Sequence, residues 1–166
     1  MDAAVFIHTG FAVGGHMESC RPMHLDEICL RYPSLKVVAY HFGRLEHETL
    51  NALAWKHKNL YIGMSGTLGS WYYAPQRLVH QVGMVMNLFQ GSEKLIFGTD
   101  WLAAPADLSV QALLNLEISE ELQQGWGYPP ITKQDLAKLL NLEVPARLQG
   151  IVSRRLGMRS CWTPIR

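Results

Sequence analysis

The chain has 166 residues, of which 48% are hydrophobic and 17% are charged, and its net charge is +1. This length supports one domain or a piece of one. Because basic and acidic side chains nearly cancel, the composition excludes a broad electrostatic surface for nucleic acid or acidic membranes. No apolar run approaches the roughly 18 residues of a membrane-spanning helix, so no transmembrane segment is expected.

The N-terminal residues and the cysteines bear on the compartment of the protein. Residues 1–4, Met-Asp-Ala-Ala, contain no basic side chain, so we expect no secretory signal. The cysteines are Cys20, Cys29 and Cys161, an odd number without CxxC spacing. Such a set favours reduced, buried thiols over a disulfide or a metal site. We therefore expect a cytoplasmic protein.

Short apolar and aromatic runs, typical of β-strands, recur along the first hundred residues. They span residues 4–7, 35–40, 60–64 and 94–97. Runs of this kind, buried on both faces, are typical of parallel strands rather than half-exposed antiparallel ones. We therefore expect parallel strands at these positions.

The segments between and after these runs show the period of α-helices. Thr132 and Asp135 resemble an N-terminal capping pair for a helix that continues to about residue 140. Pro33 is expected to end the first helix and Gly91 the third. Apolar side chains recur at helical spacing in residues 25–32, 50–57, 78–89 and 110–114.

The alternation of strands and helices predicts an α/β fold with a parallel sheet and right-handed crossovers. The distance from one strand end to the next is close to the roughly 31 residues per unit of a (β/α)₈ barrel of about 250 residues. A small doubly wound sheet would also fit. The sequence has neither G-x-G-x-x-G after the first strand nor G-x-x-x-x-G-K, so nucleotide-binding versions of that sheet lose support.

Polar side chains follow the expected strands, and three of them suit chemistry. His8, His41 and Asp100 stand at the ends of the first, second and fourth strands, and Ser65 follows the third. In a parallel α/β barrel these ends meet at one mouth, where active sites are built. Imidazole and carboxylate there fit a divalent ion such as Zn²⁺, with one histidine free for proton transfer. For any single histidine, the alternative to a functional role is a structural one, as a hydrogen-bonded residue of the core.

Five segments of the sequence form an ordered set: Phe-Ile-His-Thr-Gly at 6–10, residues 26–43 with Ala-Tyr-His-Phe-Gly, residues 59–66, Phe-Gly-Thr-Asp-Trp at 97–101, and residues 138–151. Together they resemble the amidohydrolase-related family that includes aminocarboxymuconate-semialdehyde decarboxylase and γ-resorcylate decarboxylase. The resemblance runs from about residue 5 to residue 151. It implies an α/β fold, a parallel (β/α) half-barrel that corresponds to strands five to eight of a TIM barrel.

The resemblance also implies roles for the strand-end residues. His8 and Asp100 would be metal ligands, and His41 and Asp100 would carry catalysis, with His41 as the acid or base beside the ion. The ion would be divalent, with zinc expected. Hydrolytic members attack an amide, ester or lactone carbon, whereas decarboxylases release CO₂ from an aromatic or unsaturated carboxylate. The implied substrate is therefore a small carboxylated or cyclic molecule.

The sequence departs from the family pattern in ways that limit this prediction. Family members place H-x-H at the end of the first strand, and no H-x-H occurs in this chain. The closing helix is altered at Asn141 and interrupted by Pro145. We therefore expect residues 1–151 to be the C-terminal half of a barrel with an incomplete ligand set, and residues 152–166 to be a basic tail.

Two interpretations follow for this half. In the first, the chain is part of a metal-dependent hydrolase or decarboxylase and either forms a homo-oligomer or pairs with an N-terminal half-barrel. In the second, it is a non-catalytic truncated paralogue that acts as an interaction or assembly module. Neither requires nucleic acid or a membrane as a partner.

Overall fold

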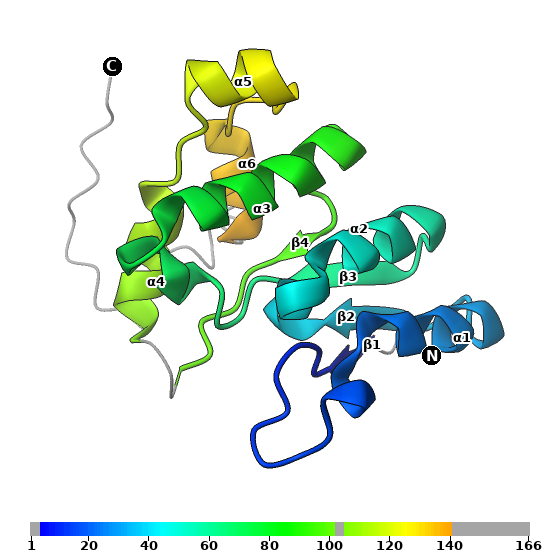
Figure 1. The fold of residues 1–166 in the computed structure, drawn as a ribbon. Coiled ribbons are helices and arrows are strands. Elements are labelled where there is room, and N and C mark those ends of the chain that lie inside the picture. Colours follow the sequence, from blue (N-terminus) through cyan, green and yellow to red (C-terminus); the bar gives the residue numbers. More distant parts are fainter. Residues whose placement is uncertain (1–3, 102–104, 141–166) are drawn as a thin grey trace, which may run out of the picture.

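A computed structural model describes residues 4–101 and 105–140 of the chain. Its strands are β1 Ala4–Ile7, β2 Lys36–Ala39, β3 Leu60–Gly63 and β4 Leu95–Ile96. They form one four-stranded parallel sheet in the order β1-β2-β3-β4 (Figure 1). The predicted strands and their parallel direction are therefore confirmed, although β2, β3 and β4 are each shorter than their apolar runs.

A helix follows each of the first three strands, and three more helices follow β4. Short 3₁₀ turns occupy the loops that follow β1, β2 and β3. The helices are α1 Leu25–Arg31, α2 His47–Lys56, α3 Pro75–Phe89, α4 Ala106–Leu114, α5 Glu120–Trp126 and α6 Lys133–Leu139. The sequence patterns predict all of them except α5.

The ends of the helices follow local chemistry. Thr132 and Asp135 form the predicted capping box at the start of α6. Helix α1 ends before Pro33, and Tyr32 at its end is 53% exposed rather than part of the buried stripe. The left-handed residue after α3 is Gln90, with φ 53°, one position before the glycine predicted to end that helix.

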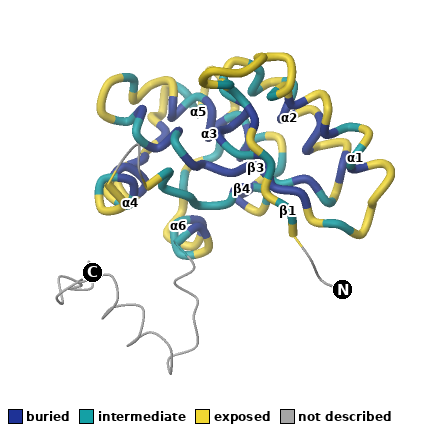
Figure 2. Tube along the Cα trace, turned by 90° about the horizontal axis from the view of Figure 1, so that it is seen from below, coloured by how far each residue is buried: buried dark blue, intermediate teal, exposed yellow. Residues whose placement is uncertain are grey.

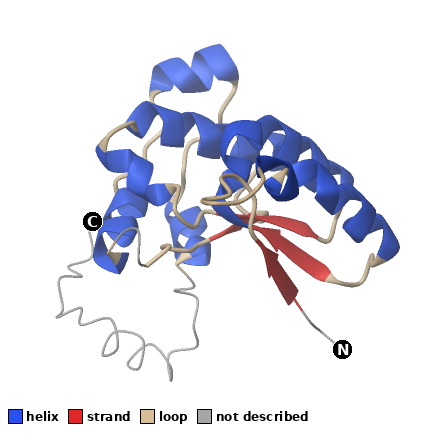
Figure 3. Ribbon diagram, turned by 60° about the horizontal axis from the view of Figure 1, so that its bottom comes forward, coloured by secondary structure: helices blue, strands red, loops and turns tan. Residues whose placement is uncertain are grey.

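One face of the sheet carries the core of the molecule. Figure 3 shows the helices gathered on one side of the strands. Strand β2 buries Val37, Val38 and Ala39, and the buried side chains of α2 and α3 belong to the same hydrophobic cluster as Val37 and Ala39. The apolar stripes predicted for α2 and α3 therefore explain why these helices pack against the sheet.

Strand β1 differs from this pattern, and the expectation of burial on both faces is wrong for it. Its residues alternate between exposed and half-buried, and Phe6 is 54% exposed (Figure 2). The reason is that β1 lies at an edge of the sheet and that no second layer covers Phe6 within the described residues. The only aromatic ring described against Phe6 is that of Tyr40, with ring centroids 5.5 Å apart.

Three further expectations concern the cysteines, membrane-spanning helices and the C-terminal residues. Cys20 and Cys29 are free thiols, but only Cys29 is buried. No helix in the described part of the chain is long and apolar enough to cross a membrane. The altered closing turn at 141–151, the basic tail at 152–166 and Cys161 lie outside the described residues.

Candidate functional site

The carboxyl ends of the strands meet at an open cavity of ≈ 610 Å³. The three residues predicted for chemistry all line it, because parallel strands place their carboxyl ends at the same edge of the sheet. His8 follows β1 directly, His41 lies two residues after β2, and Asp100 lies four residues after β4. The lining residues are Phe6, His8, Tyr40, His41, Ser65, Ile96, Phe97, Gly98, Thr99 and Asp100.

His8 and His41 both line this cavity, and their rings are in direct contact. The Nε2 atom of His41 lies 3.1 Å from Nδ1 of His8, and the rings meet edge to face. The other nitrogens are held by carbonyl oxygens, His41 Nδ1 by Ser65 at 2.8 Å and His8 Nε2 by Phe11 at 2.8 Å. Since a carbonyl oxygen only accepts hydrogen bonds, these outer nitrogens carry the protons. In the neutral pair, the facing nitrogens therefore hold lone pairs that can take up one proton or bind one cation.

Burial tunes His41 for proton exchange. Its side chain is only 9% exposed, and this desolvation lowers its pKa below the ordinary 6.5. The hydrogen bond to Ser65 and the charge of Asp100 act in the opposite direction, whereas His8 and Arg44 add to the lowering. The net effect favours a neutral imidazole that can act as a base near neutral pH.

The backbone after β2 explains how His41 reaches this position. Within Tyr40–Glu46, four consecutive residues have positive φ: His41 at 63°, Phe42 at 55°, Gly43 at 65° and Arg44 at 48°. We call residues 41–44 the left-handed turn. Each non-glycine residue in such a conformation costs roughly 1–2 kcal/mol. Phe42 is fully buried and anchors the turn in the core, so core packing opposes this cost.

Gly66 brings Asp100 and His41 together. A Cβ atom at Gly66 would lie 2.8 Å from Oδ2 of Asp100 and 2.9 Å from Nδ1 of His41, closer than real Cβ contacts. Gly66 also has φ +69°, where side chains are disfavoured. Asp100 itself has φ 59°. Gly66 was not among the predicted site residues, although a glycine directly after the strand-end Ser65 is a signal that the sequence contains.

The donors in the cavity do not make a complete metal site. Catalytic zinc usually takes three protein ligands and a water molecule. Within residues 4–101 and 105–140, no group of three or more His, Cys, Asp or Glu side chains could hold a metal ion. His8 and Asp100 line one cavity, but their predicted role as ligands stays a prediction, as do the catalytic roles of His41 and Asp100.

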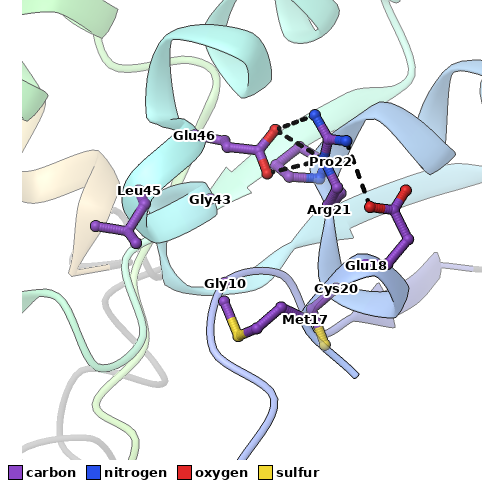
Figure 4. A pocket seen from close by; sticks show the side chains of 9 residues that line it. All are labelled: Gly10, Met17, Glu18, Cys20, Arg21, Pro22, Gly43, Leu45 and Glu46. Atoms are coloured by element: carbon purple, nitrogen blue, oxygen red, sulfur yellow. Dashed lines mark hydrogen bonds and ion pairs between the residues drawn. The ribbon is translucent and has the colours of Figure 1, made fainter. Parts of the chain in front are cut away.

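A second, smaller cavity lies between the loops that follow β1 and β2, with a volume of ≈ 250 Å³ (Figure 4). Its charged side chains are already paired. Arg21 donates to both carboxylate oxygens of Glu46, at 3.1 and 3.3 Å from Nε, and contacts Glu18 at 3.4 Å. These ion pairs hold the pKa of Arg21 above its usual value. The charged groups that line this cavity therefore bind one another, and the remaining lining residues are glycine, apolar or sulfur-containing residues.

Comparison with known proteins gives two kinds of match. The family model described as amidohydrolase matches residues 1–142. An uncharacterised TIM-barrel protein from Bordetella bronchiseptica is 19% identical with a TM-score of 0.53, over 83% of this chain and 45% of that one. A dihydroxybenzoic acid decarboxylase from Polaromonas sp. JS666, solved with manganese and the inhibitor 2-nitroresorcinol, is 18% identical with a TM-score of 0.42, over 81% and 44%. No curated protein matches the chain.

These matches bear on fold and family. The chain spans slightly less than half the length of both solved structures. The likeness to the Bordetella protein shows the fold, so the four-stranded sheet is part of a TIM barrel. The assignment to strands five to eight stays a prediction. Because the family model covers most of the sequence, the chain belongs to the amidohydrolase family.

Proposed function

We propose that the chain supplies half of the active site of a metal-dependent hydrolase or decarboxylase that acts on a small carboxylated or cyclic substrate. The observation that carries this proposal is the buried His41, which faces His8 in the cavity at the strand ends. Membership of the amidohydrolase family supports the same reading.

In this proposal His41 is the group that moves a proton. The Ser65 carbonyl holds the proton on Nδ1, so Nε2 is left to exchange a proton with the substrate or with water. The lowered pKa keeps this nitrogen unprotonated near neutral pH. Asp100 is half-buried in the same cavity and is the second candidate for acid or base work.

We further propose that the ion is zinc and that part of its ligand set comes from outside the described residues. His8 Nδ1 and the Asp100 carboxylate are the donors that this chain would contribute, and both atom types suit zinc. A complete set requires at least one more ligand, which fits the absence of H-x-H from the sequence.

The missing half of the barrel is the partner that this proposal requires. Phe6 lies at the cavity on β1, an edge strand that is paired with a neighbouring strand in a complete barrel. A complementary unit of four parallel strands, in the same polypeptide or in another chain, would cover Phe6 and add ligands. A second copy of this chain would cover the same surface but would add no H-x-H.

Co-expression with strands one to four of a related family member tests the proposal. The purified complex is assayed for CO₂ release from aromatic and unsaturated carboxylates and for hydrolysis of amides, esters and lactones. We expect turnover in the complex and none in either half alone. A complex that forms without any turnover would favour the second candidate function, a non-catalytic assembly module. The lack of a three-ligand group in the described residues also favours that function.

A further inference from the structure

Thr9 links the ends of the first two strands through a buried hydroxyl group. Thr9 is only 1% exposed, and its Oγ1 donates a hydrogen bond to the carbonyl oxygen of Tyr40. The paired register of β1 and β2 ends at Ile7 and Ala39, so both partners of this bond lie beyond the ladder. The hydroxyl therefore ties the two segments together after their strand pairing has stopped.

The residues joined by this bond are the neighbours of the two histidines. Thr9 directly follows His8, and Tyr40 directly precedes His41. The imidazoles approach to 3.1 Å between Nδ1 of His8 and Nε2 of His41. A change in the separation of Thr9 and Tyr40 would therefore shift the backbones from which these rings project.

The other hydrogen bonds of the two imidazoles fix each ring separately. His8 Nε2 donates to the carbonyl oxygen of Phe11, within its own loop. His41 Nδ1 donates to the carbonyl oxygen of Ser65, which follows β3. Neither bond sets the distance between the two rings. That distance depends on how the ends of β1 and β2 are held together.

Threonine has the properties that this link requires. Its branched Cβ restricts χ1, so the hydroxyl group has few orientations to choose from. Gly10 follows with φ +115°, and its N–H donates to the carbonyl oxygen of Cys20 at 3.0 Å. The chain turns away from β2 at this glycine, which makes Thr9 the last residue before the turn. Its side chain is thus held at the point where the two histidine-bearing segments separate.

We propose that Thr9 is a positioning residue that sets the distance between His8 and His41. It touches no reacting atom and acts through the carbonyl group of Tyr40. The inference rests on the proposed function for what the histidine pair does, but the contact between the rings is measurable without turnover.

Nuclear Overhauser effects between the ring protons of His8 and His41 measure this contact in the full chain, with its histidines isotopically labelled. We expect a ring-to-ring cross-peak in the unaltered chain and its loss in Thr9→Val, which keeps the branched shape but has no donor. The ring ¹⁵N shifts of His41 should still show the proton on Nδ1, because the Ser65 carbonyl is unaffected. Absence of the cross-peak from the unaltered chain would overturn the proposal.

Thr67→Val is the matched control for this substitution. Thr67 is 3% exposed, and its Oγ1 has no hydrogen-bond partner among the described residues. The same change there should leave the cross-peak unchanged. A lower Tm of Thr9→Val with the cross-peak intact would show that the hydroxyl only stabilises the fold, and would overturn the proposal.

Thr9→Ser and Thr9→Ala form a second pair that differs only in the donor. We expect the cross-peak to persist in Thr9→Ser and to be lost in Thr9→Ala. Equal cross-peaks in the two variants would overturn the proposal, whether or not Thr9→Val folds.

The completed barrel adds a kinetic test. Thr9→Val should lower kcat about 10²-fold at unchanged KM, because a displacement of about 1 Å can cost that much. A change in KM alone would contradict a positioning role. An inactive completed barrel in which the cross-peak still depends on the Thr9 hydroxyl would refute the proposed function and leave the role of Thr9 intact.

Discussion

Gly66 shows how a single residue shapes the candidate site. The carboxylate of Asp100 and the imidazole of His41 both approach the space that a side chain at this position would fill. The left-handed turn, held in the core by Phe42, brings His41 to the same place from the other side. The site therefore depends on residues that carry no reactive group.

Alanine substitution of two glycines tests this dependence. Gly66 and Gly14 have similar φ angles, +69° and +75°, but a Cβ at Gly14 would meet nothing within 4 Å. Both substitutions lose stability because of positive φ, and Gly66→Ala should lose a further 1–3 kcal/mol, roughly the cost of overpacking. Urea unfolding measures the two free energies of unfolding. Equal losses in the two variants would contradict the close approach at Gly66.

The sequence could predict that His8, His41 and Asp100 share one cavity, but it could not predict which residues hold them in place. His8 and His41 stand directly after strand-like runs and Asp100 stands three residues after one, and parallel topology alone brings strand ends together. The positive φ of Arg44 leaves no trace in a sequence, because arginine rarely adopts it. Its proximity to Gly10 and Phe11 depends on two loops from separate strands, which no local pattern encodes.

At the scale of helices and strands, local signals were most reliable where several agreed. Helix α6 has a capping pair followed by an apolar stripe, and both are present in the structure. Helix α5 has a capping serine, Ser119, and a left-handed glycine, Gly127, but it buries no residue. An apolar stripe could not reveal it, because it has no buried face. The sequence nevertheless contains a signal for each end of α5: a serine followed by two glutamates at its start, and a glycine after its last residue.

The capping box of α6 predicts a pH dependence of stability. Burial raises the pKa of Asp135, but the hydrogen bonds that its carboxylate accepts from Thr132 and Ser92 outweigh this effect and leave the pKa below its ordinary 3.8. As pH falls from 3.8 towards the folded-state pKa, the unfolded chain binds more protons, so this contribution to stability is present above 3.8 and is lost on acidification.

We expect Asp135→Asn to lower the free energy of unfolding at pH 7 by about 1–2 kcal/mol and to reduce its fall between pH 5 and pH 3. Urea unfolding across this range provides the measurement. Glu117→Gln, at an exposed loop carboxylate, is the matched control and should leave the profile unchanged. An Asp135→Asn profile parallel to that of the unaltered chain would show that this carboxylate is not linked to folding.

At the scale of the whole molecule, the sheet is unevenly covered. Helices bury one face, whereas β1 remains half-exposed and β1 and β4 form the two edges. Edge strands present unpaired backbone donors and acceptors, which favour association. Exposed apolar side chains such as Phe6 favour it further.

We therefore expect the isolated chain to self-associate, and Phe6→Glu to reduce the association. Trp55→Glu is the control, because Trp55 is 67% exposed on α2, away from the cavity. Analytical ultracentrifugation over a range of concentrations measures the oligomeric state. A stable monomer of the unaltered chain, or an equal effect of the two substitutions, would contradict a role for the β1 surface in assembly.

In the completed barrel, we expect His41, which faces His8 at the strand ends, to transfer protons. The most direct test of this role is turnover by the complemented complex that carries His41→Asn, with His16→Asn, an exposed histidine outside both cavities, as control. We predict a fall in kcat of about 10²–10⁴ for His41→Asn, with metal content intact, and no change for the control. Undiminished turnover, or loss of metal on this substitution, would contradict the claim.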